Sequence, residues 1–145
     1  MKIYMYEILN QINSTDSKNE KKKIMLDNAT PWFKQMLSIA FDPKYQFYVD
    51  KFPTNYIPPR DTAPGISYSD LQTELRRIYL FQKGDPVGDS LSDEKRNQLL
   101  IQILESFEPN EAKVFVNMLC KDLKTKGLTP NLVKEVFPGL LPNNE

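Results

Sequence analysis

The chain of 145 residues contains no histidine and only one cysteine, Cys120. Without histidine it has no Ser-His-Asp triad, no Cys-His pair and no imidazole metal ligand. A single cysteine excludes an intrachain disulfide and a zinc site built on thiolates. With five glycines, the chain also lacks a glycine-rich phosphate-binding loop. These absences argue against a self-contained enzyme, and we expect neither a cofactor nor a metal ion.

Long apolar runs are also missing. No stretch approaches the roughly 18 apolar residues that span a bilayer. Glu7, Asn10 and Gln11 interrupt the N-terminal segment where a signal peptide has its apolar centre. We therefore expect no membrane partner and a cytoplasmic location, which for a viral protein is the host cytoplasm.

Apolar residues at helical spacing dominate what is present. Met5, Ile8, Leu9 and Ile12 fall on one helix face. Similar stripes and cap signals predict further helices that begin at Ser17, Thr30-Pro31, Asp42-Pro43, about residue 69, ahead of Leu100, at Glu108-Pro109 and at Thr129-Pro130. No segment alternates as a strand does. The predicted fold class is all-α, one domain over residues 1–145 with seven or eight helices.

Prolines and glycines mark the connections between these helices. Residues 53–66 hold four prolines and predict an extended connection, and residues 84–92 predict a loop. The helix over 69–83 should bury Tyr79 along with its leucines. Gly127 is expected to end the helix that begins at Glu108. The aromatic residues between 32 and 52 are expected in the core, and a base-stacking platform for single strands is the alternative.

Charge is balanced overall but separated along the chain. Lysine plus arginine and aspartate plus glutamate each number 19, which excludes a histone-like binder. Residues 113–134 hold five lysines and one acid, whereas residues 84–111 hold seven acids and two bases. Lys21, Lys22 and Lys23, flanked by Glu20 and Asp27, are expected to be a solvated face.

The basic stretch surrounds a predicted helix-turn-helix joint over residues 124–131. Lysines beside the free N–H groups of a helix start favour a phosphate, with little base selectivity. The plainer alternative is that these lysines are a solvated helix surface.

A second pattern points the same way. Asp42-Pro43 followed by Lys51-Phe52-Pro53 resembles Thr129-Pro130 followed by Val136-Phe137-Pro138. Two such helix-turn-helix units, related by an approximate two-fold axis, would match the two strands of a duplex across its minor groove. The alternative is that Phe-Pro is merely a common helix stop.

A C-terminal motif comprises residues 114–123, Gly127, Asn131, Lys134 and the closing Val136-Phe137-Pro138-Gly139-Leu140-Leu141-Pro142. This motif resembles the end of the N-terminal DNA-binding domain of ATP-dependent DNA ligases, nearest to the T-even bacteriophage type. Residues 8–12 and 45–53 are similar too. The resemblance implies an all-helical module that grips duplex DNA through the minor groove around a nick. Carried over by position, the implied contacts are Lys44, Gln46, Lys51, Lys121, Lys124, Lys126, Gly127, Thr129, Asn131 and Lys134.

The chain departs from that family in ways that bear on activity. It has no Lys-x-Asp-Gly motif, so we expect no catalysis by this chain alone, whether it belongs to a longer ligase or stands free as a viral protein. Lys121 replaces the usual arginine and Phe137 the usual tryptophan. Expected partners are nicked duplex DNA and a nucleotidyltransferase domain or another viral protein. The alternative is a viral accessory or structural module that reuses the fold to bind protein.

Overall fold

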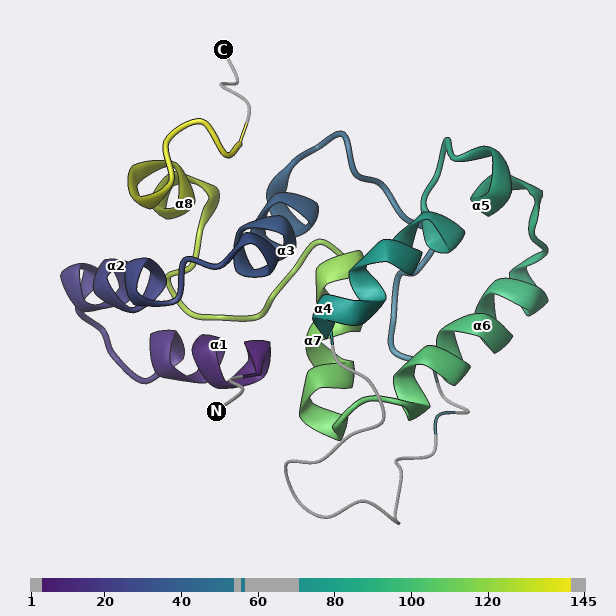
Figure 1. Ribbon diagram of the computed structural model, residues 1–145, viewed down its shortest axis with the longest axis horizontal. Coiled ribbons are helices and arrows are strands. Elements are labelled where there is room, and N and C mark those ends of the chain that lie inside the picture. Colours follow the sequence, from purple (N-terminus) through teal and green to yellow (C-terminus); the bar gives the residue numbers. More distant parts are fainter. Residues whose placement is uncertain (1–3, 54–55, 57–70, 142–145) are drawn as a thin grey trace.

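The computed structural model describes residues 4–53, 56 and 71–141, and within this part of the chain helices joined by loops are the regular elements (Figure 1). Its elements are α1 (Met5–Asn13), α2 (Lys18–Asp27), α3 (Pro31–Phe41), α4 (Leu71–Glu74), the 3-10 helix η1 (Leu75–Phe81), α5 (Pro86–Ser90), α6 (Asp93–Glu105), α7 (Pro109–Leu119) and α8 (Pro130–Val136). The predicted all-α fold class is confirmed. None of the described helices is long and apolar enough to cross a membrane.

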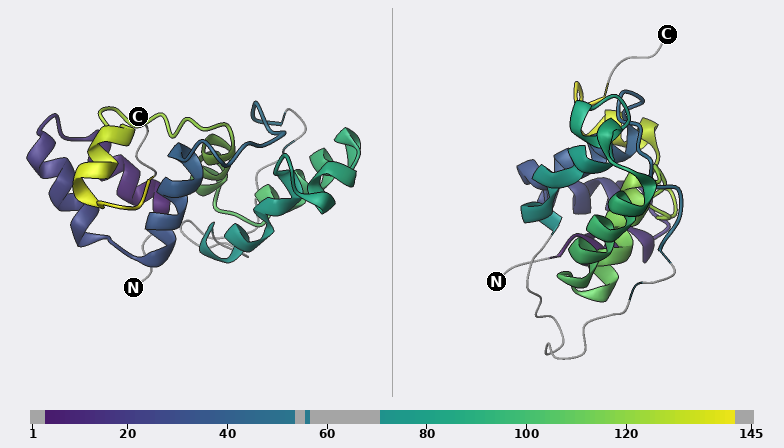
Figure 2. Two further views of the ribbon diagram at one scale, coloured as in Figure 1. Left: turned by 90° about the horizontal axis from the view of Figure 1, so that it is seen from above. Right: turned by 90° about the vertical axis from the view of Figure 1, so that its right-hand side faces the viewer.

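Helix α7 is the centre of the molecule. It contacts α1 and α3 on one side and α4 and α6 on the other. Figure 2 shows the resulting elongated shape, with α2 and α8 at one end and α5 and α6 at the other. Seven α7 side chains are buried, including Phe115 and Met118, which are fully shielded from solvent. One continuous apolar core therefore runs through both halves and joins them.

Local cap chemistry begins most of the helices where the sequence predicts. Ser17, Thr30 and Thr129 each accept a hydrogen bond from the backbone N–H three residues ahead. Proline occupies the first turn of α3, α7 and α8, where it has no hydrogen bond to lose. These starts depend on contacts within three residues, which is why sequence reasoning located them.

The predicted helix over residues 42–52 is wrong. Asp42 instead ends α3, and its N–H donates to the Ser38 carbonyl at 2.8 Å. Phe47 is buried and forms an isolated β-bridge with Gln82. The N–H of Tyr48 donates to the Phe81 carbonyl at 2.8 Å, so this backbone is committed to a distant segment and not to a helix. The first of the two predicted helix-turn-helix units therefore does not form, and in the second the helices α7 and α8 are both present but are separated by the ten residues 120–129.

The segment around residue 80 also differs from expectation. The predicted helix over 69–83 is four α-helical residues followed by η1, with Tyr79 exposed and Phe81 buried. The predicted loop over 84–92 contains α5, because the Asp85 carboxylate accepts hydrogen bonds from the Val87 and Gly88 amides. Most of the predicted connection over 53–66 lies outside the described residues.

The sequence predicts that Gly127 ends α7, and this prediction is wrong. The helix closes eight residues earlier, where Lys121 adopts a left-handed conformation with φ of 65°. Its N–H donates to Met118, and the N–H of Asp122 donates to Asn117, the bond pair of a Schellman motif. A lysine thus holds the position that glycine usually fills, and the chain turns there into the loop before α8.

Candidate nucleic-acid interface

The loop of residues 120–129, here called the α7–α8 loop, carries five of the ten predicted contacts. Lys124, Lys126 and Gly127 are exposed on it, and Asn131 follows in the first turn of α8. The Lys126 N–H donates to Asn13 Oδ1 at 3.1 Å, and the Lys124 N–H donates to Asp122 Oδ1 at 3.0 Å. The loop backbone is thus held in place while the side chains of Lys124 and Lys126 face solvent.

Lys21 lies beneath this loop and is buried, so its expected place on a solvated face is wrong. Its Nζ donates to the Ile12 carbonyl at 2.7 Å and to the Lys126 carbonyl at 2.9 Å. Ile12 is in the last turn of α1, where carbonyls lack helical partners and the helix dipole favours a cation. Lys21 therefore joins α1, α2 and the α7–α8 loop.

Lys121 holds the other end of the loop in the same manner. Its Nζ donates to the Ile39 carbonyl at 2.5 Å and to the Asp42 carbonyl at 2.6 Å, which closes the C-terminus of α3. Burial lowers the pKa of this ammonium group to about 8. The Lys121 charge is engaged inside the protein, unlike those of Lys124 and Lys126.

Two depressions meet along the loop. The loop hollow, about 410 Å³, is lined by Lys121, Lys124 and Lys126, with Asp122 its one acid. The α1–α7 groove, about 170 Å³, is lined by Lys113 and Lys124 and by no acid. Both depressions are bordered by Asn13, Leu123, Lys124 and Thr125, so they adjoin each other, and the pair is here called the basic trough.

The remaining C-terminal predictions lie just beyond this trough. Gly127, Thr129 and Asn131 line a separate hollow of about 310 Å³, together with Lys18 and Glu135. The Glu135 carboxylate pairs with Lys18 at 2.9 Å and with Lys22 at 3.2 Å, and these two ammonium groups lower its pKa. Lys134 is half-buried in the last turn of α8.

The N-terminal predictions are divided between two places. Lys44 lies close to the loop, because its Nζ is 5.1 Å from the Tyr45 ring centre and that of Lys121 is 5.9 Å from the same ring. Gln46 is exposed, and its Nε2 donates to the Pro43 carbonyl at 2.8 Å. Lys51 instead borders a different cavity.

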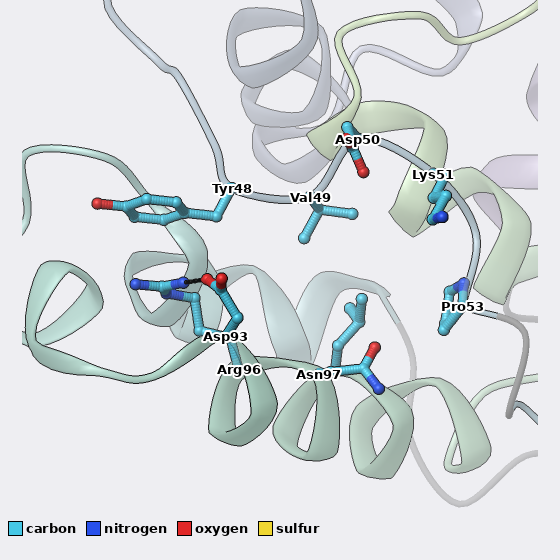
Figure 3. Close-up of a pocket in the computed structure, with 9 residues that line it drawn as sticks. Tyr48, Val49, Asp50, Lys51, Pro53, Asp93, Arg96 and Asn97 are labelled. Atoms are coloured by element: carbon cyan, nitrogen blue, oxygen red, sulfur yellow. Dashed lines mark hydrogen bonds and ion pairs between the residues drawn. The ribbon is translucent and has the colours of Figure 1, made fainter.

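That cavity, here called the Tyr48 hollow, is about 360 Å³ and is shown in Figure 3. The Arg96 guanidinium carbon lies 3.7 Å from the centre of the Tyr48 ring. Arg96 also donates to the Gly88 and Leu91 carbonyls and pairs with Asp93. Asp50 and Asp93 balance Lys51 and Arg96 around the opening, so this hollow has no net preference for an anion.

The sequence reasoning missed the polar side chains of the groove. Asn10 and Asn13 share one face of α1, and Asn110, Lys113 and Asn117 share one face of α7. Their spacings of three and four residues were a readable signal. No group of acidic or cysteine side chains suited to a metal ion exists among the described residues. Asp85 accepts from the Val87 N–H at the start of α5, and Asp89 accepts from the Gly84 N–H.

A buried carboxylate anchors one side of this groove. Glu111 of α7 accepts hydrogen bonds from the Met5 N–H at 3.0 Å and from the Tyr6 N–H at 2.8 Å. Burial raises the pKa of Glu111 to about 7, against the opposing effect of these two hydrogen bonds. Glu111 thereby fixes the start of α1 against α7.

Comparison with known proteins identifies the fold. Two solved structures, named "Pmar-Lig_PreS3" and "Pmar-Lig_Pre.", match with a TM-score of 0.72 at 19% and 18% identity. Each match covers 93% of this chain and 29% of the other, so the chain spans less than a third of those ligase-related proteins. No curated protein matches the sequence. The family model that matches residues 8–125 describes a family of unknown function, DUF6433, and the chain belongs to that family.

Proposed function

We propose that this chain is a non-catalytic module of DNA-ligase type that binds duplex DNA around a nick without sequence preference. The observation that carries the proposal is the α7–α8 loop, which presents Lys124 and Lys126 to solvent on a backbone held by two engaged lysines, Lys21 and Lys121. Because this backbone is already held, binding a phosphate does not carry the entropy cost of ordering the loop. The likeness in fold to ligase-related structures supports the same assignment.

The loop chemistry favours phosphate oxygens over base edges. Lysine ammonium groups are point charges that contact the backbone of any sequence. Lys126 is paired with Asp16 at 3.2 Å, but both side chains are exposed, and such surface pairs contribute little. A phosphate can replace the Asp16 carboxylate at small cost.

The proposed direct contacts are the outward-facing groups among those that the ligase resemblance implies. They are Lys44, Lys124, Lys126, Gly127, Thr129, Asn131 and Lys134. Lys121 acts by positioning the loop. Gln46 adds an exposed side chain two residues from Lys44, and Lys51 lies apart from the loop, at the Tyr48 hollow. Any nucleotidyl transfer belongs to a separate domain, because the chain has no Lys-x-Asp-Gly motif.

Fluorescence anisotropy of labelled nicked and intact duplexes, titrated at several salt concentrations, tests the proposal. We expect binding that weakens steeply with salt and is the same for unrelated sequences. The double variant Lys124→Gln, Lys126→Gln should flatten the slope of log K against log salt by about 1.8, or about 0.9 for each phosphate that the variant no longer neutralises. Lys95→Gln, an exposed lysine on α6, is the matched control. Affinity weaker than about millimolar at low salt would refute DNA binding.

The second candidate is a protein-interaction module. Tyr48, Tyr79 and Val87 expose 37%, 41% and 46% of their surfaces at the acidic end of the molecule. Exposed aromatic side chains of this kind suit a protein interface. A partner that co-purifies after nuclease treatment, from a protein that does not bind duplex DNA, would favour this candidate.

A further inference from the structure

We propose that the α1–α7 groove binds the sugar-phosphate backbone of one DNA strand and so extends the binding surface beyond the α7–α8 loop. The inference rests on the proposed function and assigns it a second subsite. None of the residues that give the groove its polar character, apart from Lys124, is implied by the ligase resemblance.

Two packed helices build the groove. Helix α1 supplies Asn10 and Asn13, three residues apart, and α7 supplies Lys113 and Asn117, four residues apart. Such spacings place each pair on one helix face. Leu9, Val114 and Leu123 form an apolar floor between the two helices. The groove is therefore part of the rigid centre of the molecule.

The charge of the groove favours an anion. Acids and bases are equal in number over the whole chain, yet no acid lines the groove and two lysines do. Among the described residues, neither Lys113 nor Lys124 forms an ion pair. Lys126 and Lys22, by contrast, are each paired with a carboxylate. The two groove lysines therefore retain their full capacity for a phosphate.

The amide groups add donors at fixed positions. Asn117 is half-buried, and no hydrogen bond of its side-chain amide to another described residue is formed. Asn13 uses Oδ1 to accept from the Lys126 N–H, which turns its NH₂ group to other acceptors. Asn110 is committed to Glu108, because its Nδ2 donates to Glu108 Oε1 at 3.1 Å. Asn13 and Asn117 are thus the amides available to phosphate or sugar oxygens.

Continuity with the loop hollow selects a strand over a small anion. Lys124 and Thr125 border both depressions, so a single path runs from Lys113 past Lys124 to Lys126. Cations in two adjoining depressions suit the successive phosphate charges of one strand. A single phosphate would need only one of these positions.

Anisotropy with a nicked duplex separates this subsite from the loop site. Lys113→Gln should weaken binding about three- to tenfold at low salt and flatten the salt slope by about 0.9, as expected when one phosphate is no longer neutralised. Asn117→Ala should weaken binding without changing the slope, because an amide displaces no counterion. Lys95→Gln is the control for charge, and thermal unfolding checks that each variant is folded. Inorganic phosphate, added at constant ionic strength, is the competing small anion.

The outcomes are distinct. If Lys124→Gln, Lys126→Gln weakens binding while Lys113→Gln and Asn117→Ala behave as Lys95→Gln does, the groove subsite is refuted and the proposed function stands. If the unmodified protein does not bind the duplex, the proposed function fails. If phosphate binds the unmodified protein but not Lys113→Gln, while Lys113→Gln leaves the affinity and salt slope for the duplex unchanged, the groove is a small-anion site and the strand assignment is overturned.

Discussion

The Lys21 ammonium group donates a hydrogen bond to the Lys126 carbonyl, 2.9 Å away, and so links α2 to a loop 105 residues further along the chain. The same group closes the C-terminus of α1 through Ile12. Lys21 as a whole is 5% exposed, and a buried ammonium group is costly unless its N–H groups have acceptors. Here the Ile12 and Lys126 carbonyls are those acceptors. A buried lysine thus shapes the surface on which exposed lysines act.

Replacing Lys21 should therefore destabilise the protein. Lys21→Met keeps the aliphatic stem but leaves the Ile12 and Lys126 carbonyls without their donor, and we expect a loss of about 1–3 kcal/mol. Lys23→Met, an exposed neighbour on α2, should change stability by less than about 0.5 kcal/mol. Urea unfolding followed by circular dichroism measures both, and equal losses would contradict the buried role.

Gly127 should tolerate a side chain less well than Gly84. Both glycines have left-handed φ angles, 77° and 91°, which cost an alanine about 1–2 kcal/mol. A Cβ on Gly127 would also lie 2.9 Å from Lys21 Cε, whereas nothing lies within 4 Å of one on Gly84. Since Lys21 is held by two hydrogen bonds, it cannot move aside freely. Urea unfolding should show that Gly127→Ala lowers the free energy of unfolding more than Gly84→Ala does. A smaller decrease for Gly127→Ala would disprove the close approach to Lys21.

Lys121 should affect stability more than the electrostatics of DNA binding. Lys121→Gln loses charge-assisted bonds to the Ile39 and Asp42 carbonyls, and we expect a loss of about 1.5–3 kcal/mol in unfolding free energy. Because the ammonium group faces α3, the salt slope of DNA binding should stay close to that of the unmodified protein. A slope that falls as far as for Lys124→Gln would show instead that Lys121 contacts phosphate.

Glu111 should make stability depend on pH. Its pKa is about 7 in the folded protein and 4.5 in the unfolded reference, so the folded state holds the proton more tightly. This contribution to stability is complete below pH 4.5 and is lost as pH rises through 7, by about 3 kcal/mol. The variant Glu111→Gln, whose side chain does not titrate, should lack this part of the pH dependence. Parallel pH profiles of the two proteins would contradict the assignment.

The sequence alone predicts those features of the helices that depend on residues close together in the chain. The apolar stripe of α1, the caps at Thr30 and Thr129 and the break at Glu108-Pro109 all involve residues within one helical turn, so spacing predicts them. The basic stretch around Lys124 and Lys126 was also visible, since charge is a property of composition. Asn110, Lys113 and Asn117 also have helical spacing, but only the packing of α1 against α7 shows that they line a groove.

Only the tertiary structure decided which lysines are exposed and where the chain is not helical. Three consecutive lysines, 21 to 23, look alike in the sequence. Only Lys21 donates hydrogen bonds to backbone carbonyls of two other segments. Residues 43–52 carry a helix-start signal, but Phe47 is buried beside Gln82, and that distant pairing uses the backbone groups a helix would need. Gln82 is 35 residues from Phe47 and Lys126 is 105 residues from Lys21, and no local pattern records such distant pairings.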